Sequence, residues 1–132
     1  MIHIKYKLDK SFNHGIGLFA GEDLTEGQLV YTASPLLDVN ITQVQFDSLS
    51  DKEKEEIKWW GFKIEDEGVW HVDFDVSKFI NHSYEATVTQ DSKHKDAYLV
   101  TTRDMKAGEE ITQNYLEFES AEALKQRGIS VQ

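Results

Sequence analysis

Short runs of alternating hydrophobic and polar side chains dominate the pattern of this chain. Residues 1–7 alternate in this way, which is typical of a strand with one buried face. Four further runs are rich in β-branched and aromatic residues and predict strands: Leu18–Ala20, Gln28–Thr32, Val69–Asp73 and Tyr98–Thr102. Glycine-containing turns are expected at residues 13–17 and 24–28. The pattern therefore predicts a mostly β fold.

Two segments carry helix signals. Ser50 followed by Glu53 is a capping-box pattern, which predicts a helix over residues 51–59. The hydrophobic residues expected to cover one side of this helix are Leu49, Ile57, Trp59 and Trp60. A second helix is expected over residues 120–127, with Gly128 as its stop. One inserted helix and one terminal helix thus accompany the strands.

Composition is that of an ordinary globular domain. The chain has 132 residues, of which 39% are hydrophobic and 29% charged, enough for one continuous core. Cysteine is absent, which excludes disulfides and thiolate zinc sites. The N-terminal residues lack the apolar stretch of a signal peptide, and no apolar run approaches the ~20 residues of a membrane span. We therefore expect an intracellular protein, cytoplasmic if it is prokaryotic, without a membrane partner.

The net charge of −10 limits the class of partner. Direct nucleic-acid binding normally needs a basic face that neutralises phosphates, so we expect none here. An acidic surface attracts basic polypeptides by long-range steering, although the same charge also serves as a solvated surface. Charge therefore favours a Lys-rich protein or peptide as partner.

Three short blocks carry candidate chemistry, and each has an ordinary structural explanation as well. The glycines of Gly15-Ile16-Gly17 let the backbone approach a ligand, or simply make a tight strand connection. No third glycine or following helix makes this block a dinucleotide fingerprint. Asn81-His82-Ser83 is either a functional cluster or a polar turn. Tyr115 lies at the end of an expected strand, where a tyrosine is usually a core or interface residue.

Other kinds of site find little support. His82 has no recognised metal-ligand spacing to His71, Asp73 or Asp75, so we expect no metal site. Glu109 and Glu110 are adjacent on an expected strand and point to opposite faces, which makes them a poor acid/base pair.

Taken in order, the blocks resemble the SET domain, a family of protein-lysine methyltransferases that use S-adenosylmethionine. The matching segments span roughly residues 4–118 and comprise Gly15–Ala20, Glu26–Tyr31, His71–Asp73, Lys78–Ser83 and Arg103–Tyr115. The resemblance implies a β-clip-like fold of several small sheets with one or two short helices and a C-terminal pseudoknot. It places the SET domain at residues 1–118, a variable insert at about 40–65, and a helical tail at 119–132.

The resemblance also implies roles for individual residues in cofactor binding. Gly15, Ile16 and Gly17 would line the methionine part of S-adenosyl-L-methionine through backbone contacts. Asn81 and His82 would hold its amino group and its adenine.

For the chemistry, the resemblance implies that Tyr115 is the catalytic residue and also contacts the cofactor, with its hydroxyl beside the transferring methyl group. Tyr31 and Phe118 would line the substrate channel, with further aromatic walls from Trp59, Trp60 or Trp70. A narrow apolar channel and the sulfonium charge both lower the pKa of the substrate lysine, so no dedicated general base is required.

The sequence departs from the family pattern directly after Asn81-His82-Ser83. Tyr84–Thr87 replaces the Cys-x-Pro-Asn of many members, so a cysteine-based zinc cluster cannot form, and Thr87 replaces an asparagine that helps to fix the knot. No aromatic residue beyond Phe118 is available to cover the adenine, so the tail helix or a second subunit of a homodimer would have to do so. Two interpretations remain: an active protein-lysine N-methyltransferase, or a catalytically inactive SET-like protein-binding module.

Overall fold

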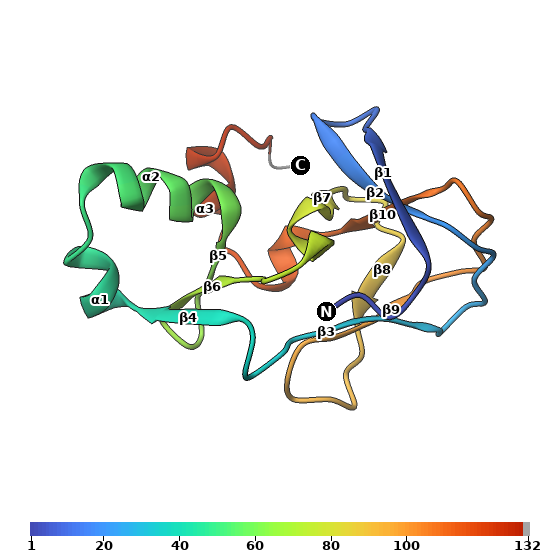
Figure 1. Cartoon of the computed structure of the whole chain (residues 1–132), viewed down its shortest axis with the longest axis horizontal. Coiled ribbons are helices and arrows are strands. Elements are labelled where there is room, and N and C mark those ends of the chain that lie inside the picture. Colours follow the sequence, from blue (N-terminus) through green and yellow to red (C-terminus); the bar gives the residue numbers. More distant parts are fainter. Residues whose placement is uncertain (131–132) are drawn as a thin grey trace.

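The computed structural model describes residues 1–130 and is built mainly from short strands (Figure 1). The strands of this described part are β1 (Tyr6–Lys10), β2 (Ile16–Ala20), β3 (Leu29–Thr32), β4 (Val39–Thr42), β5 (Phe62–Ile64), β6 (Val69–Val72), β7 (Asn81–His82), β8 (Val88–Gln90), β9 (Tyr98–Thr101) and β10 (Glu110–Gln113). Its helices are α1 (Gln43–Asp47), α2 (Asp51–Trp60) and α3 (Ala121–Gln126), with single 3₁₀ turns η1 (Val76–Phe79) and η2 (Tyr115–Glu117). The mostly β prediction is confirmed. The last two positions of the predicted tail, 131 and 132, lie outside the described residues.

Strand β10 is the hub of the larger sheet, whose order is β1-β2-β10-β8-β9-β3 with β7 also paired to β10. It runs antiparallel to β2 and parallel to β7 and β8. In this register Thr112 lies opposite Asn81 and Gln113 opposite His82. The last sequence block is therefore held against the segment around residues 80–83, as the expected crossing requires.

The hydrophobic core is formed mainly by buried side chains from the strands of this sheet. Leu18, Val30, Val88 and Ile111 have no exposed surface. Leu24 and Met105 close one end, because each donates its backbone N–H to the other's carbonyl at 2.9 Å. Burying each such side chain contributes about 1.5–3 kcal/mol, so these inward positions select the strand register.

The second sheet, in the order β4-β6-β5, forms the other half of the molecule together with α1 and α2 (Figure 1). Trp70 of β6 stacks on Phe46 of α1 with ring centroids 4.5 Å apart, which is the core of this half. The predicted capping box of α2 is confirmed, with Ser50 Oγ accepting from the Glu53 N–H and Glu53 Oε1 accepting from the Ser50 N–H. Thr42 begins the unexpected helix α1 with a second capping box.

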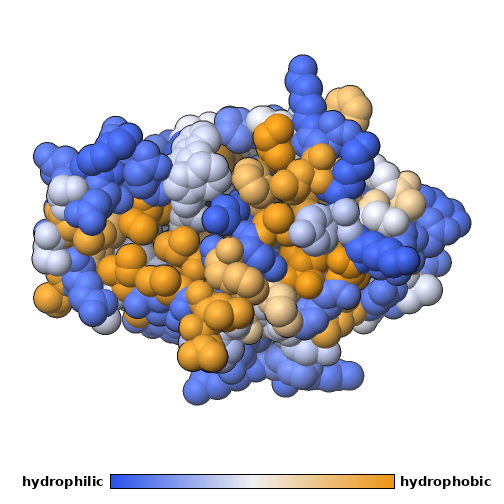
Figure 2. Space-filling model, viewed as in Figure 1, coloured by the Kyte–Doolittle hydropathy of each residue, from blue (hydrophilic) through white to orange (hydrophobic). Residues whose placement is uncertain are grey.

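Two expectations about the elements were wrong. The first strand begins at Tyr6 rather than at residue 1, because the N-terminal residues lie against β3, where Ile2 bridges Tyr31. Helix α2 buries none of its residues, and Trp59 and Trp60 remain 63% and 40% exposed because they face a pocket rather than the core. Hydrophobic side chains nevertheless gather across the middle of the face shown in Figure 2. None of the described helices is long and apolar enough to cross a membrane.

Candidate active site

Asn81 ties the glycine turn to the centre of the larger sheet. Its Nδ2 donates to the backbone carbonyls of His14 and Ile16 at 3.0 and 3.1 Å. The same nitrogen lies 3.2 Å from Glu110 Oε2 on β10. The parallel pairing of β7 with β10 makes this contact, so residues far apart in sequence meet at one point.

The close approach at this point requires glycine. Gly15 has a φ of +53°, a backbone conformation that residues other than glycine rarely adopt. A Cβ added to Gly17 would lie 2.8 Å from Glu110 Oε2 and 3.2 Å from the Ser11 Cβ. The structure thus brings Gly15, Ile16 and Gly17 together with Asn81, as the sequence analysis expected of cofactor-binding residues.

Glu110 is a site residue that the sequence analysis did not single out. Besides the contact with Asn81, it accepts a bifurcated hydrogen bond from the Ser11 hydroxyl, whose oxygen lies 2.8 and 3.0 Å from Oε1 and Oε2. Glu109 points away and pairs with Arg103 at 2.8 Å, so the expectation that the two glutamates do not form an acid/base pair is confirmed. The only sequence signal for Glu110 was its place in the last block.

His82 and Tyr115 are joined directly. The Tyr115 N–H donates to His82 Nδ1 at 3.0 Å, and the two ring centroids are 5.3 Å apart. Burial and the nearby Arg127 charge lower the pKa of His82, so its ring is neutral and Nε2 carries the proton. That buried Nε2 has no hydrogen-bond partner among the described residues.

The Tyr115 hydroxyl donates to the backbone carbonyl of Ile80. Burial, the largest cause, raises the pKa of Tyr115 to about 12, so the hydroxyl keeps its proton at neutral pH. The Arg127 guanidinium lies over the same ring, 5.3 Å from its centroid, and is paired with the buried carboxylate of Glu119.

One pocket collects the predicted channel residues. Tyr31 of β3, Phe118 and Tyr115 all line it, together with Trp59 and Trp60 at the end of α2. Trp70, the third candidate wall residue, is instead packed on Phe46 away from this pocket. Aromatic side chains from several elements therefore line the pocket together with Tyr115.

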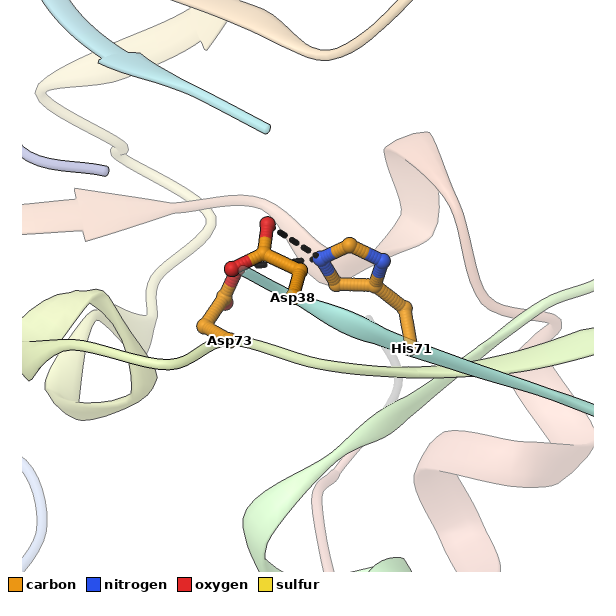
Figure 3. A group of neighbouring side chains, drawn as sticks. All are labelled: Asp38, His71 and Asp73. Carbon is orange, nitrogen blue, oxygen red and sulfur yellow. Dashed lines mark hydrogen bonds and ion pairs between the residues drawn. The ribbon is translucent and has the colours of Figure 1, made fainter. Parts of the chain in front are cut away.

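A charged cluster extends from the pocket wall, and Figure 3 shows its side chains pointing toward one another. His71 Nε2 is 3.2 Å from Asp38 Oδ2 and 3.0 Å from Asp73 Oδ1, while Nδ1 faces the Asn40 Oδ1 at 2.7 Å. The Tyr31 hydroxyl donates to Asp73 Oδ1 as well. Sequence reasoning considered His71 and Asp73 as possible metal-ligand partners of His82 and as part of a matching family segment, and it missed Asp38, which no spacing rule connects to them.

The cluster sets the charge of its members. Burial acts to lower the pKa of His71, but the hydrogen bonds and charges of Asp73 and Asp38 outweigh it, so the net pKa is raised. Burial, followed by the Asp73 charge and hydrogen bond, raises the pKa of Tyr31 far above its usual range. The arrangement is therefore an imidazolium held between two carboxylates, with a neutral phenol donating to one of them.

The tail of the same chain lies beside His82. Tyr84 packs edge-on against the His82 ring, with centroids 4.5 Å apart, and its hydroxyl donates to the Ser130 carbonyl at 2.6 Å. Leu124 of α3 has no exposed surface, which anchors the tail. The tail of the chain therefore lies beside Tyr84 and His82, with the contact made by Ser130 beyond the end of α3, and the cover of the adenine stays a prediction.

Comparisons with known proteins agree with this geometry. The family model of the SET domain matches residues 15–116, more than half of the chain. A chain of the Apo ctPRC2 structure with mutations in Ezh2 is 26% identical, with a TM-score of 0.68 over 94% of this chain and 16% of that one. A chain of Chaetomium thermophilum Polycomb Repressive Complex 2 bound to GSK126 is 25% identical, with a TM-score of 0.66 over 95% and 17%.

A proposed histone methyltransferase of Plasmodium falciparum is 13% identical, with a TM-score of 0.58 over 86% of this chain and 95% of that one, which shows the fold alone. A search of curated proteins found no match. This chain spans about a sixth of the length of the polycomb chains. The family match, the β10 hub and the Asn81–Tyr115 geometry lead to one conclusion: the chain belongs to the SET-domain family.

Proposed function

We propose that the protein transfers a methyl group from S-adenosylmethionine to a lysine side chain of a basic protein or peptide. The observation that carries the proposal is the position of Tyr115. Its hydroxyl donates to the Ile80 carbonyl, its backbone is bonded to His82, and it lines one pocket with Tyr31 and Phe118. Membership of a methyltransferase family and the acidic charge of −10 support the substrate class.

The residues around Asn81 fit the proposed cofactor. The carbonyls of His14 and Ile16 and the Glu110 carboxylate form an acceptor-rich corner suited to an ammonium group. His82 Nε2 is a buried donor without a partner among the described residues, and a ligand nitrogen or oxygen would satisfy it. When bound, S-adenosylmethionine supplies a methyl group activated by its sulfonium.

The pocket residues would then align the substrate amine. Burial raises the pKa of Tyr115 to about 12, so its hydroxyl is neutral. This hydroxyl and the Ile80 carbonyl provide polar groups among the residues that line the pocket. Tyr31, Phe118 and the tryptophans exclude water, which favours the neutral amine that attacks. The main catalytic contribution of the protein is to hold the amine nitrogen of the substrate in line with the methyl group.

The inactive-module alternative rested on the changed segment Tyr84–Thr87. Thr87 Oγ1 donates to the Glu110 carbonyl at 2.9 Å and accepts from the Thr112 N–H at 2.9 Å. The replacement therefore keeps β10 tied at the crossing, and the reason for preferring the inactive alternative is weakened.

Calorimetric titration with S-adenosylmethionine tests the proposal, followed by transfer of labelled methyl groups to a mixture of basic proteins. We expect saturable binding and label on lysine that depends on the protein. No detectable binding would end the methyltransferase proposal, and binding without transfer would favour the inactive module.

A further inference from the structure

Asp73 places a carboxylate in the wall of the pocket that also holds Tyr115 and Phe118. It directly follows the last residue of β6, and it is only 6% exposed. The sequence analysis expected an apolar channel, so a buried carboxylate here requires a reason.

The surrounding side chains hold this carboxylate in a defined position. The Tyr31 hydroxyl and His71 Nε2 both donate to Asp73 Oδ1, the latter at 3.0 Å. None of the hydrogen bonds among the described residues uses Oδ2. One oxygen is thus anchored and the other is left to meet a ligand.

The charges of the cluster do not cancel. His71 carries one positive charge, since both ring nitrogens face acceptors, while Asp38 and Asp73 carry two negative ones. Asp38 is also bonded by the Ser34 N–H at 2.8 Å and the Phe74 N–H at 3.1 Å, one on each oxygen. The uncompensated charge therefore falls on Asp73, the member of the cluster that reaches the pocket.

The cations of the chain near the pocket are engaged elsewhere. Arg127 pairs with Glu119, and the Lys78 ammonium lies 5.8 Å from the centroid of the Trp60 ring. Neither forms an ion pair with Asp73 among the described residues. A buried carboxylate without a full counter-charge is costly, and a cation entering the pocket would relieve that cost.

We infer that Asp73 binds the protonated ε-amino group of the incoming lysine, with Tyr31, His71 and Asp38 as the residues that position it. This inference rests on the proposed function and adds to it the step before methyl transfer. The lysine enters as an ammonium ion and is recognised by its charge. A neutral side chain of the same length gains no binding affinity from Asp73.

The first experiment compares two probes, Nα-acetyl-lysine methylamide and Nα-acetyl-norleucine methylamide, which differ by the charged group. Their binding is followed by NMR of the His71 ring. We expect the lysine probe to bind at least about tenfold more tightly, the usual effect of a charged hydrogen bond. Equal affinities would overturn the inference.

A second readout separates binding from a merely structural role. The charged groups that face the His71 ring are Asp38 and Asp73, with Tyr31 beyond Asp73. A cation bound at Asp73 disfavours the imidazolium, so the lysine probe should lower the pKa of His71 while the norleucine probe leaves it unchanged. An unchanged His71 pKa at saturating lysine probe would contradict the proposed contact.

Asp73→Asn should abolish the preference for the lysine probe. Asp66→Asn, in the exposed turn between β5 and β6, is the matched control for the loss of one carboxylate. If Asp73→Asn does not fold, the probe-dependent pKa of His71 in the unmodified protein still decides the question.

These measurements do not need the cofactor. Lysine preference without binding of S-adenosylmethionine would reject the proposed methyl transfer and leave the Asp73 site standing. Cofactor binding and methyl transfer without lysine preference would reject the Asp73 site alone.

Discussion

Thr87 illustrates how single residues keep the SET geometry despite a changed sequence. Its hydroxyl both donates to the Glu110 carbonyl and accepts from the Thr112 N–H, and its own N–H donates to the Thr112 carbonyl at 3.0 Å. A shorter side chain than asparagine thus ties the segment before β8 to β10. Asn81, His82 and Tyr115 likewise each make their contacts through a specific atom. Substituting each of them should therefore have a distinct effect.

Tyr115→Phe should lower turnover about a hundredfold while cofactor affinity changes little. The variant keeps the ring and the backbone bond to His82 but loses the hydroxyl that donates to the Ile80 carbonyl, so the amine is misplaced. Initial methylation rates and cofactor calorimetry on the same preparation check this. Wild-type turnover in the variant would remove the hydroxyl from the mechanism.

Asn81→Ala should weaken S-adenosylmethionine binding by about 1.5–3 kcal/mol, the value of a hydrogen bond to a charged group. The variant also frees the His14 and Ile16 carbonyls, which loosens the glycine turn. The exposed Asn13→Ala in the same turn is the control, because its side chain has no bond of this kind. A dissociation constant unchanged from wild type would show that Asn81 does not hold the cofactor.

His71 should make stability depend on pH. Because the folded-state pKa is raised above the ordinary 6.5, protonation stabilises the fold. That contribution is fully present below about pH 6.5 and is lost as pH rises through the higher folded-state pKa. Melting temperatures measured across this window should fall with rising pH in the wild type.

His71→Gln should flatten that part of the profile, whereas the exposed His94→Gln should leave it as in the wild type. A slope that survives in His71→Gln would assign the pH dependence to another group.

At the scale of elements, β10 and the glycine turn form one unit. The antiparallel pairing with β2 and the parallel pairing with β7 leave no room for a side chain at Gly17, where Glu110 passes close by. In the other half, α2 contributes aromatic side chains to the pocket instead of to the core, which explains why its hydrophobic residues stay exposed.

Gly17→Ala should therefore cost about 1–3 kcal/mol of stability through overpacking against Glu110 and Ser11, and should weaken cofactor binding. Gly27→Ala has open space around it and strains only a backbone with a φ of +78°, so it should leave cofactor affinity unchanged. Urea unfolding and calorimetry on both variants check the difference. Equal loss of affinity would show that the close approach at Gly17 is not specific to the site.

At the scale of the molecule, the tail packs against the site. Leu124 is fully buried, and Arg127 reaches back to Glu119 and the Tyr115 ring. The predicted boundary at residue 118 therefore cuts through packed structure.

A chain that ends at residue 118 should melt at a lower temperature than one that ends at residue 130, because it loses the burial of Leu124, worth about 1.5–3 kcal/mol. Thermal unfolding of the two chains measures this. Equal melting temperatures would show that the tail is not part of the folded unit.

The sequence alone determined what depends on local pattern. Alternation and β-branched runs predicted the strands over residues 18–20, 69–73 and 98–102, and the Ser50 capping box predicted the start of α2, because side-chain period and cap chemistry act within a few residues. The ordered blocks also indicated the family, and with it the meeting of Asn81, His82 and Tyr115.

Only the tertiary structure decided which distant groups share an environment. Asp38 precedes the predicted insert at about residues 40–65 and His71 and Asp73 follow it, so no spacing rule links them until β4 and β6 pair. The direction in which α2 presents Trp59 and Trp60, and the contact of Arg127 with the Tyr115 ring, depend on long-range packing in the same way. Burial and charge at the site therefore depend on which groups the fold brings together, because desolvation and Coulomb interaction act through space and not along the chain.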